Sequence, residues 1–239
     1  MKKPQDRVIV ALDHPKLEPA LAIADSIGSR VGMLKVGLEL FNSAGPQAIS
    51  ELRRRGASVF YDSKFSDIPN TVAGAAAAAA RLGVAMFNVH TLGGMRMMAA
   101  AKDASERAAE EVGLDPPLVI GVTIVTSLGD EGVRRELGIP EGAGEAAVRL
   151  AKLAKEAGLD GVVASVYETL EIKQACGRDF VVVTPGIRPS WATVDDQARV
   201  ATPRDALVAG SDYLVIGRPV TQAEDPVEAL ERIIGEMSS

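Results

Sequence analysis

The stretch SVFYDSKFSDIPNTVAGAAAAAARLG, residues 58–83, contains the pattern on which the prediction of the fold depends. Its first part, residues 58–64, is a short apolar and aromatic run that ends in charged residues, as is typical of a buried strand. Pro69 follows, and proline favours the first turn of a helix. Residues 71–83 are rich in alanine, which is the best helix former. The stretch therefore predicts one strand followed by one helix.

The same order of strand and helix recurs along the chain in both directions from this stretch. The expected strands are residues 7–13, 32–37, 58–64, 85–90, 117–124, 161–165, 180–187 and 213–217. The expected helices are residues 19–28, 45–55, 71–83, 94–112, 145–157, 168–175, 203–209 and 226–237. Repeated strand–helix units of this kind predict an α/β protein, a closed parallel (β/α)8 barrel, also called a TIM barrel.

An open doubly wound sheet is the competing architecture. That fold usually carries a glycine-rich turn after its first strand, whereas residues 12–19, LDHPKLEP, contain no glycine. We also find no stretch with the composition of a linker between domains. The sequence therefore favours the barrel, with residues 1–239 as a single domain.

The composition limits the classes of partner and cellular location. Hydrophobic residues make up 47% of the 239 residues, and 26 Lys and Arg against 32 Asp and Glu give a net charge of −6. An acidic chain argues against nucleic acid as a partner. Cys176 is the single cysteine, which excludes an internal disulfide and a cysteine-based metal cluster. No apolar run reaches the roughly 20 residues of a membrane span, and the N-terminal run is too short for a signal peptide. We expect a cytoplasmic protein without a membrane partner.

Charged residues stand at the ends of the first three expected strands. Barrel active sites lie at the carboxyl ends of the strands. Asp13 ends the first strand, Lys35 lies in the second, and Asp62 and Lys64 lie in the third. Because Asp62 and Lys64 are two residues apart, strand alternation predicts that both point into the mouth of the barrel. With Asp67 in the following turn, the pattern predicts a cluster of alternating charge, Lys35, Asp62, Lys64 and Asp67. A network that only orients the loops is the structural alternative.

A phosphate site is predicted after the last two strands, where barrels often bind phosphate. The segment PGIRP, residues 185–189, supplies Gly186 and Arg188, and IGRP, residues 216–219, supplies Gly217 and Arg218. Glycine lets the backbone approach an anion, and the arginine side chain matches phosphate oxygens. Each motif could be a plain turn, but two on adjacent strands favour an anion site.

Six segments together resemble the orotidine 5′-phosphate decarboxylase family in its shorter bacterial form. They are VALD (10–13), LKVGLELF (34–41), FYDSKFSDIPNTV (60–72), VTSL (125–128), TPGIRP (184–189) and VIGRP (215–219), in the family's order. The resemblance implies decarboxylation of orotidine 5′-monophosphate to UMP and CO2, without a metal or cofactor, in de novo pyrimidine synthesis. It also implies a homodimer with active sites shared across the interface.

The resemblance also implies roles for individual residues. Lys64 would donate a proton to C6 of the pyrimidine, and Asp62 would face the substrate's carboxylate. Lys35 would complete the charged network and reach the ribose, and Asp67 would enter the active site of the partner subunit. The implied substrate-binding residues are Asp13, Lys35, Asp62, Ile68, Asn70, Thr71, Thr126, Ser127, Arg188, Gln197, Gly217 and Arg218.

The implied chemistry explains why a lysine is needed. Loss of CO2 from C6 leaves an in-plane electron pair that the ring cannot delocalise, and no thiamine or pyridoxal motif is visible to accept it. A cation fixed beside C6 before the reaction can stabilise this charge. We therefore expect Lys64 to stabilise the carbanion and then to protonate it.

Two other functions compete with this hypothesis. The Mg²⁺-dependent 3-keto-gulonate-phosphate decarboxylases and hexulose-phosphate synthases resemble the chain at the third strand. They place a metal-binding glutamate where this chain has Lys35, and a lysine repels a cation. His14 and His90, the only histidines, have no metal-ligand spacing with carboxylates, so no metal site is expected. The second competitor is a barrel that binds a nucleotide phosphate without catalysis.

Overall fold

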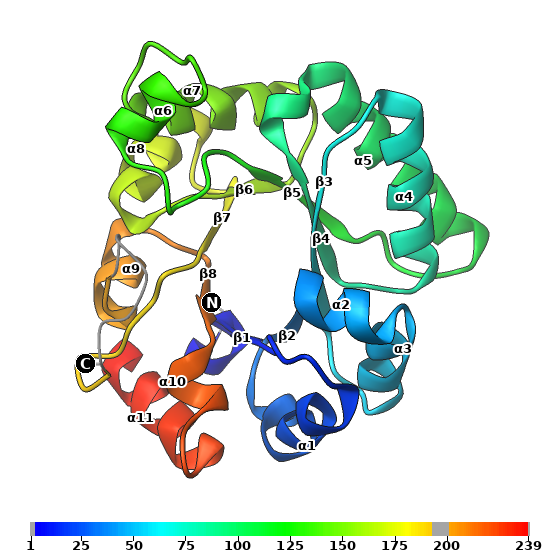
Figure 1. Ribbon diagram of the computed structural model, residues 1–239, viewed down its shortest axis with the longest axis vertical. Helices are drawn as coiled ribbons and strands as arrows, with labels where there is room; N and C mark the ends of the chain where they lie inside the picture. Colours follow the sequence, from blue (N-terminus) through cyan, green and yellow to red (C-terminus); the bar gives the residue numbers. More distant parts are fainter. Residues whose placement is uncertain (1–2, 193–200, 239) are drawn as a thin grey trace.

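The computed structural model of the chain describes residues 3–192 and 201–238, and it contains a closed eight-stranded barrel. All neighbouring strands are parallel and follow each other in chain order, and helices surround the barrel (Figure 1). The strands are β1 (Val8–Ala11), β2 (Met33–Val36), β3 (Val59–Phe65), β4 (Met86–His90), β5 (Leu118–Val122), β6 (Gly161–Val163), β7 (Val181–Thr184) and β8 (Tyr213–Ile216). The prediction of a (β/α)8 barrel is confirmed.

The helices around the barrel include those that the sequence predicts. They are α1 (Leu17–Ile27), α2 (Leu38–Ala44), α3 (Gln47–Arg54), α4 (Pro69–Arg81), α5 (Met95–Glu111), α6 (Asp130–Arg135), α7 (Ala143–Glu156), α8 (Val166–Cys176), α9 (Pro203–Ala209), α10 (Arg218–Thr221) and α11 (Pro226–Ser238). Short 3-10 helices are η1 (Pro4–Arg7), η2 (Gly28–Arg30) and η3 (Thr91–Gly93). Among the described residues, no helix is both long and apolar enough to cross a membrane.

The segment after β2 contains one helix more than predicted. The helix expected over 45–55 is present as α3, but a further helix that was not expected, α2, precedes it and ends at Gly45, whose φ of 63° lies in the left-handed region. Helix α2 is fixed from outside, because Phe41 packs on Tyr61 of β3 with ring centroids 4.5 Å apart. A contact with another element therefore contributes to the stability of this short helix.

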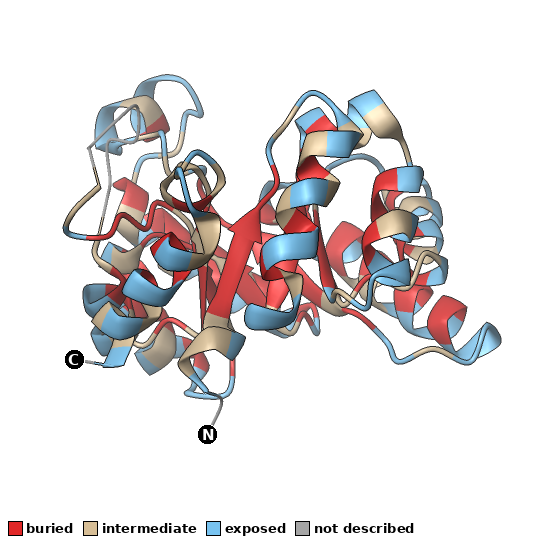
Figure 2. Ribbon diagram, turned by 90° about the horizontal axis from the view of Figure 1, so that it is seen from below, coloured by how far each residue is buried: buried red, intermediate tan, exposed pale blue. Residues whose placement is uncertain are grey.

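Side chains alternate between the inside and the outside of the barrel, as the period of a strand requires. The inward cluster is Ile9, Met33, Phe60, Met86, Ile120, Val183 and Tyr213. The outward residues join the larger core between strands and helices, and the strands are buried while the helices expose their outer faces (Figure 2). Lys35, Asp62 and Asn88 each follow an inward apolar residue by two positions. A polar layer therefore lies above an apolar one at the carboxyl end of the barrel.

Candidate active site

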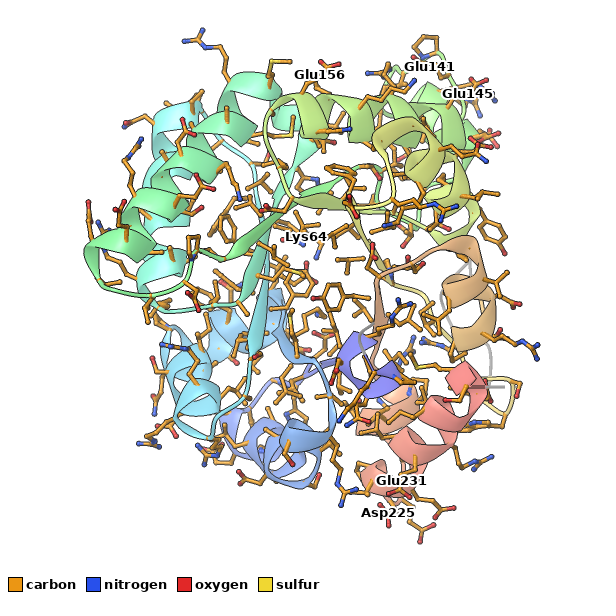
Figure 3. The ribbon with its side chains drawn as sticks, turned by 180° about the vertical axis from the view of Figure 1, so that it is seen from behind. Lys64, Glu141, Glu145, Glu156, Asp225 and Glu231 are labelled. Carbon is orange, nitrogen blue, oxygen red and sulfur yellow. The ribbon has the colours of Figure 1, made fainter. Side chains whose placement is uncertain are left out.

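A cavity of about 630 Å³ lies at the carboxyl end of the barrel. The predicted site residues that line it are Asp13, Lys35, Asp62, Lys64, Thr126, Ser127, Arg188, Gly217 and Arg218. Lys64 lies near the centre of the ring of strands, whereas the other labelled residues, such as Glu141 and Glu231, lie at the periphery (Figure 3). The barrel thus brings these predicted residues, which belong to six of its strands or the loops after them, into one space.

Four of these residues form a chain of ion pairs. Lys35 Nζ lies 2.8 Å from Asp13 Oδ1 and 3.3 Å from Asp62 Oδ2. Lys64 Nζ lies 2.5 Å from Asp62 Oδ1. The expected alternation of positive and negative charge is present, but within a single subunit the second acidic residue of the network is Asp13. Asp67 is not part of this network of ion pairs, and this corrects the expected cluster for a single subunit.

The network keeps its charged states despite burial. Burial alone would lower the pKa of Lys35, but the charges and hydrogen bonds of Asp62 and Asp13 outweigh it and raise that pKa. Burial would raise the pKa of Asp62, but the charges and hydrogen bonds of its partners, Lys35 and Lys64 foremost, lower it overall. At neutral pH the centre of the site is therefore an ionised Lys35–Asp62 pair.

Lys64 does not sit in a regular strand. Between Tyr61 and Phe65 β3 advances four residues, while its neighbour β4 advances only two, from Phe87 to Val89. Lys64 has a φ of 50°, the one positive value among the described residues that are not glycine. A left-handed conformation costs a residue with a Cβ roughly 1–2 kcal/mol. Asp62 and Lys64 do point to the same place, but a bulge in β3 produces this, not the strand alternation that the prediction used.

Asn88 is a site residue to which sequence reasoning gave no role. Its exposed fraction is 1%, it lines the cavity, and its Nδ2 donates a hydrogen bond of 2.7 Å to Asp62 Oδ1. Its Oδ1 accepts one of 2.7 Å from the backbone N–H of Lys64. The available signal was its position two residues after the inward Met86, which is the offset that Asp62 has from Phe60.

The predicted phosphate residues lie on one side of the cavity. Arg188 is buried, and Gly186 before it has a φ of 77°, which suits glycine. Gly217 directly precedes α10, whose first residue is Arg218, and both residues line the same cavity as Arg188. This grouping suits a phosphate. Gln197 lies outside the described residues. His14, Thr221 and Gln222 also line the cavity, and the sequence did not single them out as ligands.

Four other predicted residues, Asp67, Ile68, Asn70 and Thr71, are not among the described residues that line the cavity. All four are exposed, and Asp67 Oδ1 accepts a hydrogen bond of 2.6 Å from the backbone N–H of Ile68. Ile68 directly precedes α4 and has an exposed fraction of 67%. Within one chain, these four side chains therefore lie outside the cavity that holds the ion cluster.

The histidines do not form a metal site in the described part of the chain, where no group of three or more His, Cys, Asp and Glu could hold a metal ion. His90 is half-buried at the end of β4, and burial together with the charge of Lys64 lowers its pKa. His90 is therefore neutral at physiological pH. Lys35 occupies the space between the carboxylates of Asp13 and Asp62.

Comparisons with known proteins agree on one family. Residues 6–233 match the sequence model of the orotidine 5′-phosphate decarboxylase / HUMPS family. The chain is 51% identical over 233 residues to an orotidine 5′-phosphate decarboxylase of Moorella thermoacetica, covering 98% of this chain and 92% of that one. It is 49% identical over 238 residues to the enzyme of Saccharophagus degradans, covering 100% and 98%. The crystal structure of the Lactobacillus acidophilus enzyme superposes with a TM-score of 0.86 at 40% identity, covering 97% and 99%.

Proposed function

The chain belongs to the orotidine 5′-phosphate decarboxylase / HUMPS family, and from this membership we propose that it decarboxylates orotidine 5′-monophosphate to UMP in pyrimidine biosynthesis. It is a carboxy-lyase. The observation that carries this function is the ion pair between Lys64 and Asp62, held by Lys35 inside a cavity that also contains Arg188 and Arg218.

In the proposed reaction the two ends of the substrate have separate tasks. Arg188, Arg218 and the backbone at Gly217 hold the phosphate, and Asp13 and Lys35 bind the ribose. Asp62 faces the substrate's carboxylate. Enzymes lower reaction barriers by at least about 8 kcal/mol, which no single ion pair can supply. Binding energy from the phosphate can be used to orient the base over Lys64.

The chemical step breaks the bond between C6 and the carboxylate and releases CO2. The electron pair of that bond stays on C6, in the plane of the ring. The ammonium group of Lys64 stabilises this charge because it is fixed before the reaction starts. A proton then passes from Lys64 Nζ to C6 and forms the C6–H bond of UMP. The ion pair with Asp62 keeps Nζ in place, since Lys64 Nζ lies 2.5 Å from Asp62 Oδ1.

The Mg²⁺-dependent alternative is disfavoured by Lys35. A divalent ion would need the carboxylate oxygens of Asp13 and Asp62, to which hard cations bind. Lys35 Nζ contacts one oxygen of each, at 2.8 and 3.3 Å, and its raised pKa keeps it cationic. We therefore expect catalysis to proceed without an added metal.

The homodimer and the cytoplasmic location are part of the same proposal. Exposed apolar side chains follow the carboxyl ends of three neighbouring strands, β2, β3 and β4. They are Leu38, Ile68, Leu92 and Met95, exposed by 49%, 67%, 50% and 42%. Exposed apolar side chains that follow three neighbouring strands suit contact with a partner subunit. Asp67, which is exposed in the same region, would then reach the partner's ion cluster.

A direct assay tests the function. We expect the purified protein to convert orotidine 5′-monophosphate to UMP, measured by loss of orotidylate absorbance, and EDTA to leave the rate unchanged. Lys64→Ala should lower kcat by several orders of magnitude, because it removes both the cation and the proton donor. The variant should still bind UMP through the phosphate residues. A wild-type protein that binds UMP without turnover would instead support the non-catalytic alternative, and a rate restored only by Mg²⁺ would support the metal-dependent one.

A further inference from the structure

We propose that Asn88 is a positioning residue for the decarboxylation, one that holds Lys64 and Asp62 in their reactive arrangement without touching the reacting atoms. This inference rests on the proposed function and goes beyond the set of charged residues that the family resemblance implies.

The first argument is the register of the two strands. The bulge in β3 places Asp62, Ser63 and Lys64 opposite a stretch of β4 in which Asn88 is the only residue between Phe87 and Val89. Asn88 makes one hydrogen bond to each of the three. Its Nδ2 donates to Asp62 Oδ1 at 2.7 Å, its backbone oxygen accepts from Ser63 Oγ at 2.7 Å, and its Oδ1 accepts from the Lys64 N–H at 2.7 Å. A single residue thus makes a hydrogen bond with each of the three residues of the bulge.

The second argument is the chemistry of the amide group. An ionised carboxylate can only accept hydrogen bonds, and a backbone N–H can only donate them. The side chain facing Asp62 and Lys64 must therefore present a donor and an acceptor at once, which an amide does. The orientation of the Asn88 amide is fixed by these partners. Its replacement by an apolar residue would leave the Lys64 N–H without this acceptor.

The third argument is how the oxygens of Asp62 are divided. Oδ2 faces Lys35 at 3.3 Å, and Oδ1 is shared by Lys64 Nζ and Asn88 Nδ2. Because Asn88 holds Oδ1 from β4, rotation of the Asp62 carboxylate is restricted. Asn88 also holds the backbone of Lys64 in its left-handed conformation, with φ at 50°. The Asp62 carboxylate and the Lys64 backbone are thus held by the same side chain.

The test compares Asn88→Ala with Ser63→Ala in the full-length protein. Ser63→Ala is the matched control, since it removes a buried hydrogen bond of the same bulge but none to Asp62 or Lys64. We expect Asn88→Ala to lower kcat by about 10- to 100-fold, the effect of a misplaced catalytic group. KM and the Kd of UMP should change by less than about threefold, because the phosphate grip is elsewhere. Ser63→Ala should keep kcat within about threefold of the wild type.

A second variant, Asn88→Asp, keeps the volume of the side chain and adds a titration. At neutral pH the introduced carboxylate cannot donate to Asp62, so kcat should fall. Lowering the pH protonates it and restores an O–H donor, so the ratio of variant to wild-type kcat should rise toward acid pH. The charged or titratable groups around this position are Asp62, Lys64, Lys35 and His90, and dividing by the wild-type kcat removes the pH dependence that the two proteins share.

Three results would overturn the inference: equal kcat in Asn88→Ala and wild type, equal losses in Asn88→Ala and Ser63→Ala, or a loss confined to KM. If Asn88→Ala does not fold, Asn88→Asp decides, and a kcat ratio that stays flat with pH counts against the proposal. An inactive wild-type protein would refute the proposed function itself, so the two failures are distinguishable.

Discussion

Gly37 lies beside the ion pair of Asp13 and Lys35 and leaves no room for a side chain. A Cβ at this position would lie 2.7 Å from Asp13 Oδ1 and 2.8 Å from Lys35 Nζ. Its backbone, with φ of −92° and ψ of −176°, is extended and open to any residue. Glycine is therefore required here by space, not by conformation, and the space in question belongs to the charged network.

We predict that Gly37→Ala lowers kcat/KM by about 10- to 100-fold, because the methyl group displaces Lys35 or Asp13 from the network. Gly129→Ala is the control. Gly129 also precedes a helix, its φ of −89° and ψ of −176° are nearly the same, and a Cβ there would meet nothing within 4 Å. Steady-state kinetics and circular dichroism of both variants provide the measurement. Equal losses in the two variants would show that the cause is the helix start, not the ion pair.

Ion pairs at the amino ends of the strands connect whole elements of the barrel to one another. Asp160, just before β6, accepts hydrogen bonds from Lys102 Nζ of α5 at 2.8 and 2.7 Å and from the Val119 N–H of β5 at 2.7 Å. It therefore joins one helix to two strands. Contacts at the amino end of a barrel serve stability, because the active site lies at the opposite end.

The same arrangement recurs two strands further on. Asp212, just before β8, accepts from Lys173 Nζ of α8 at 2.5 Å and from the Val182 N–H of β7 at 2.7 Å. In both places the aspartate that precedes one strand accepts a hydrogen bond from the second residue of the strand before it. The aspartate also pairs with a lysine of the helix that leads into this earlier strand. The repeat indicates a structural device of this half of the barrel.

We predict that Asp160→Ala lowers the free energy of unfolding by about 1.5–3 kcal/mol, since it removes charged hydrogen bonds and leaves Lys102 largely buried. The kcat should stay unchanged. Glu231→Ala is the control, because its ion pair with Arg30 is exposed by 64% and 51% at the two side chains. Such a surface pair contributes about 0–1 kcal/mol. Denaturant unfolding of both variants measures the difference, and a stability loss of Glu231→Ala as large as that of Asp160→Ala would contradict the argument.

The elements that the sequence predicted and those that it missed differ in kind. The long helices have repeated apolar spacing or an alanine-rich composition, as in α4, whose Ala80 packs against Ala108 and Ala109 of α5. The short helices α2, α6 and α10 have four to seven residues and were not predicted. Helices this short are not stable by propensity alone, so contacts with neighbouring elements decide them.

At the scale of the whole molecule, the proposed dimer makes a prediction about shared sites. If Asp67 completes the partner's ion cluster, a heterodimer of a Lys64→Ala chain and an Asp67→Ala chain contains one intact site. Random mixing after reversible dissociation should then recover up to about a quarter of the wild-type activity, because half of the dimers are mixed and each has one working site.

Each variant alone, taken through the same dissociation and mixing, is the control and should remain at its own low activity. Analytical ultracentrifugation should confirm that the mixed sample is dimeric. Absence of recovery in a dimeric mixture would show that Asp67 acts within its own chain or not at all.

The sequence by itself determined the class of fold and the identity of the charged residues. Strand–helix repetition predicts the barrel, and the period of a strand indicates that Lys35 and Asp62 face inward. Only the tertiary structure decided which of these side chains meet. The register between β3 and β4 creates the bulge that turns Lys64 and makes Asn88 its partner, and the pairing of β1 with β2 brings Asp13 to Lys35. A local pattern specifies the side on which a residue lies, whereas its partner depends on strand register, which contacts across the whole sheet fix.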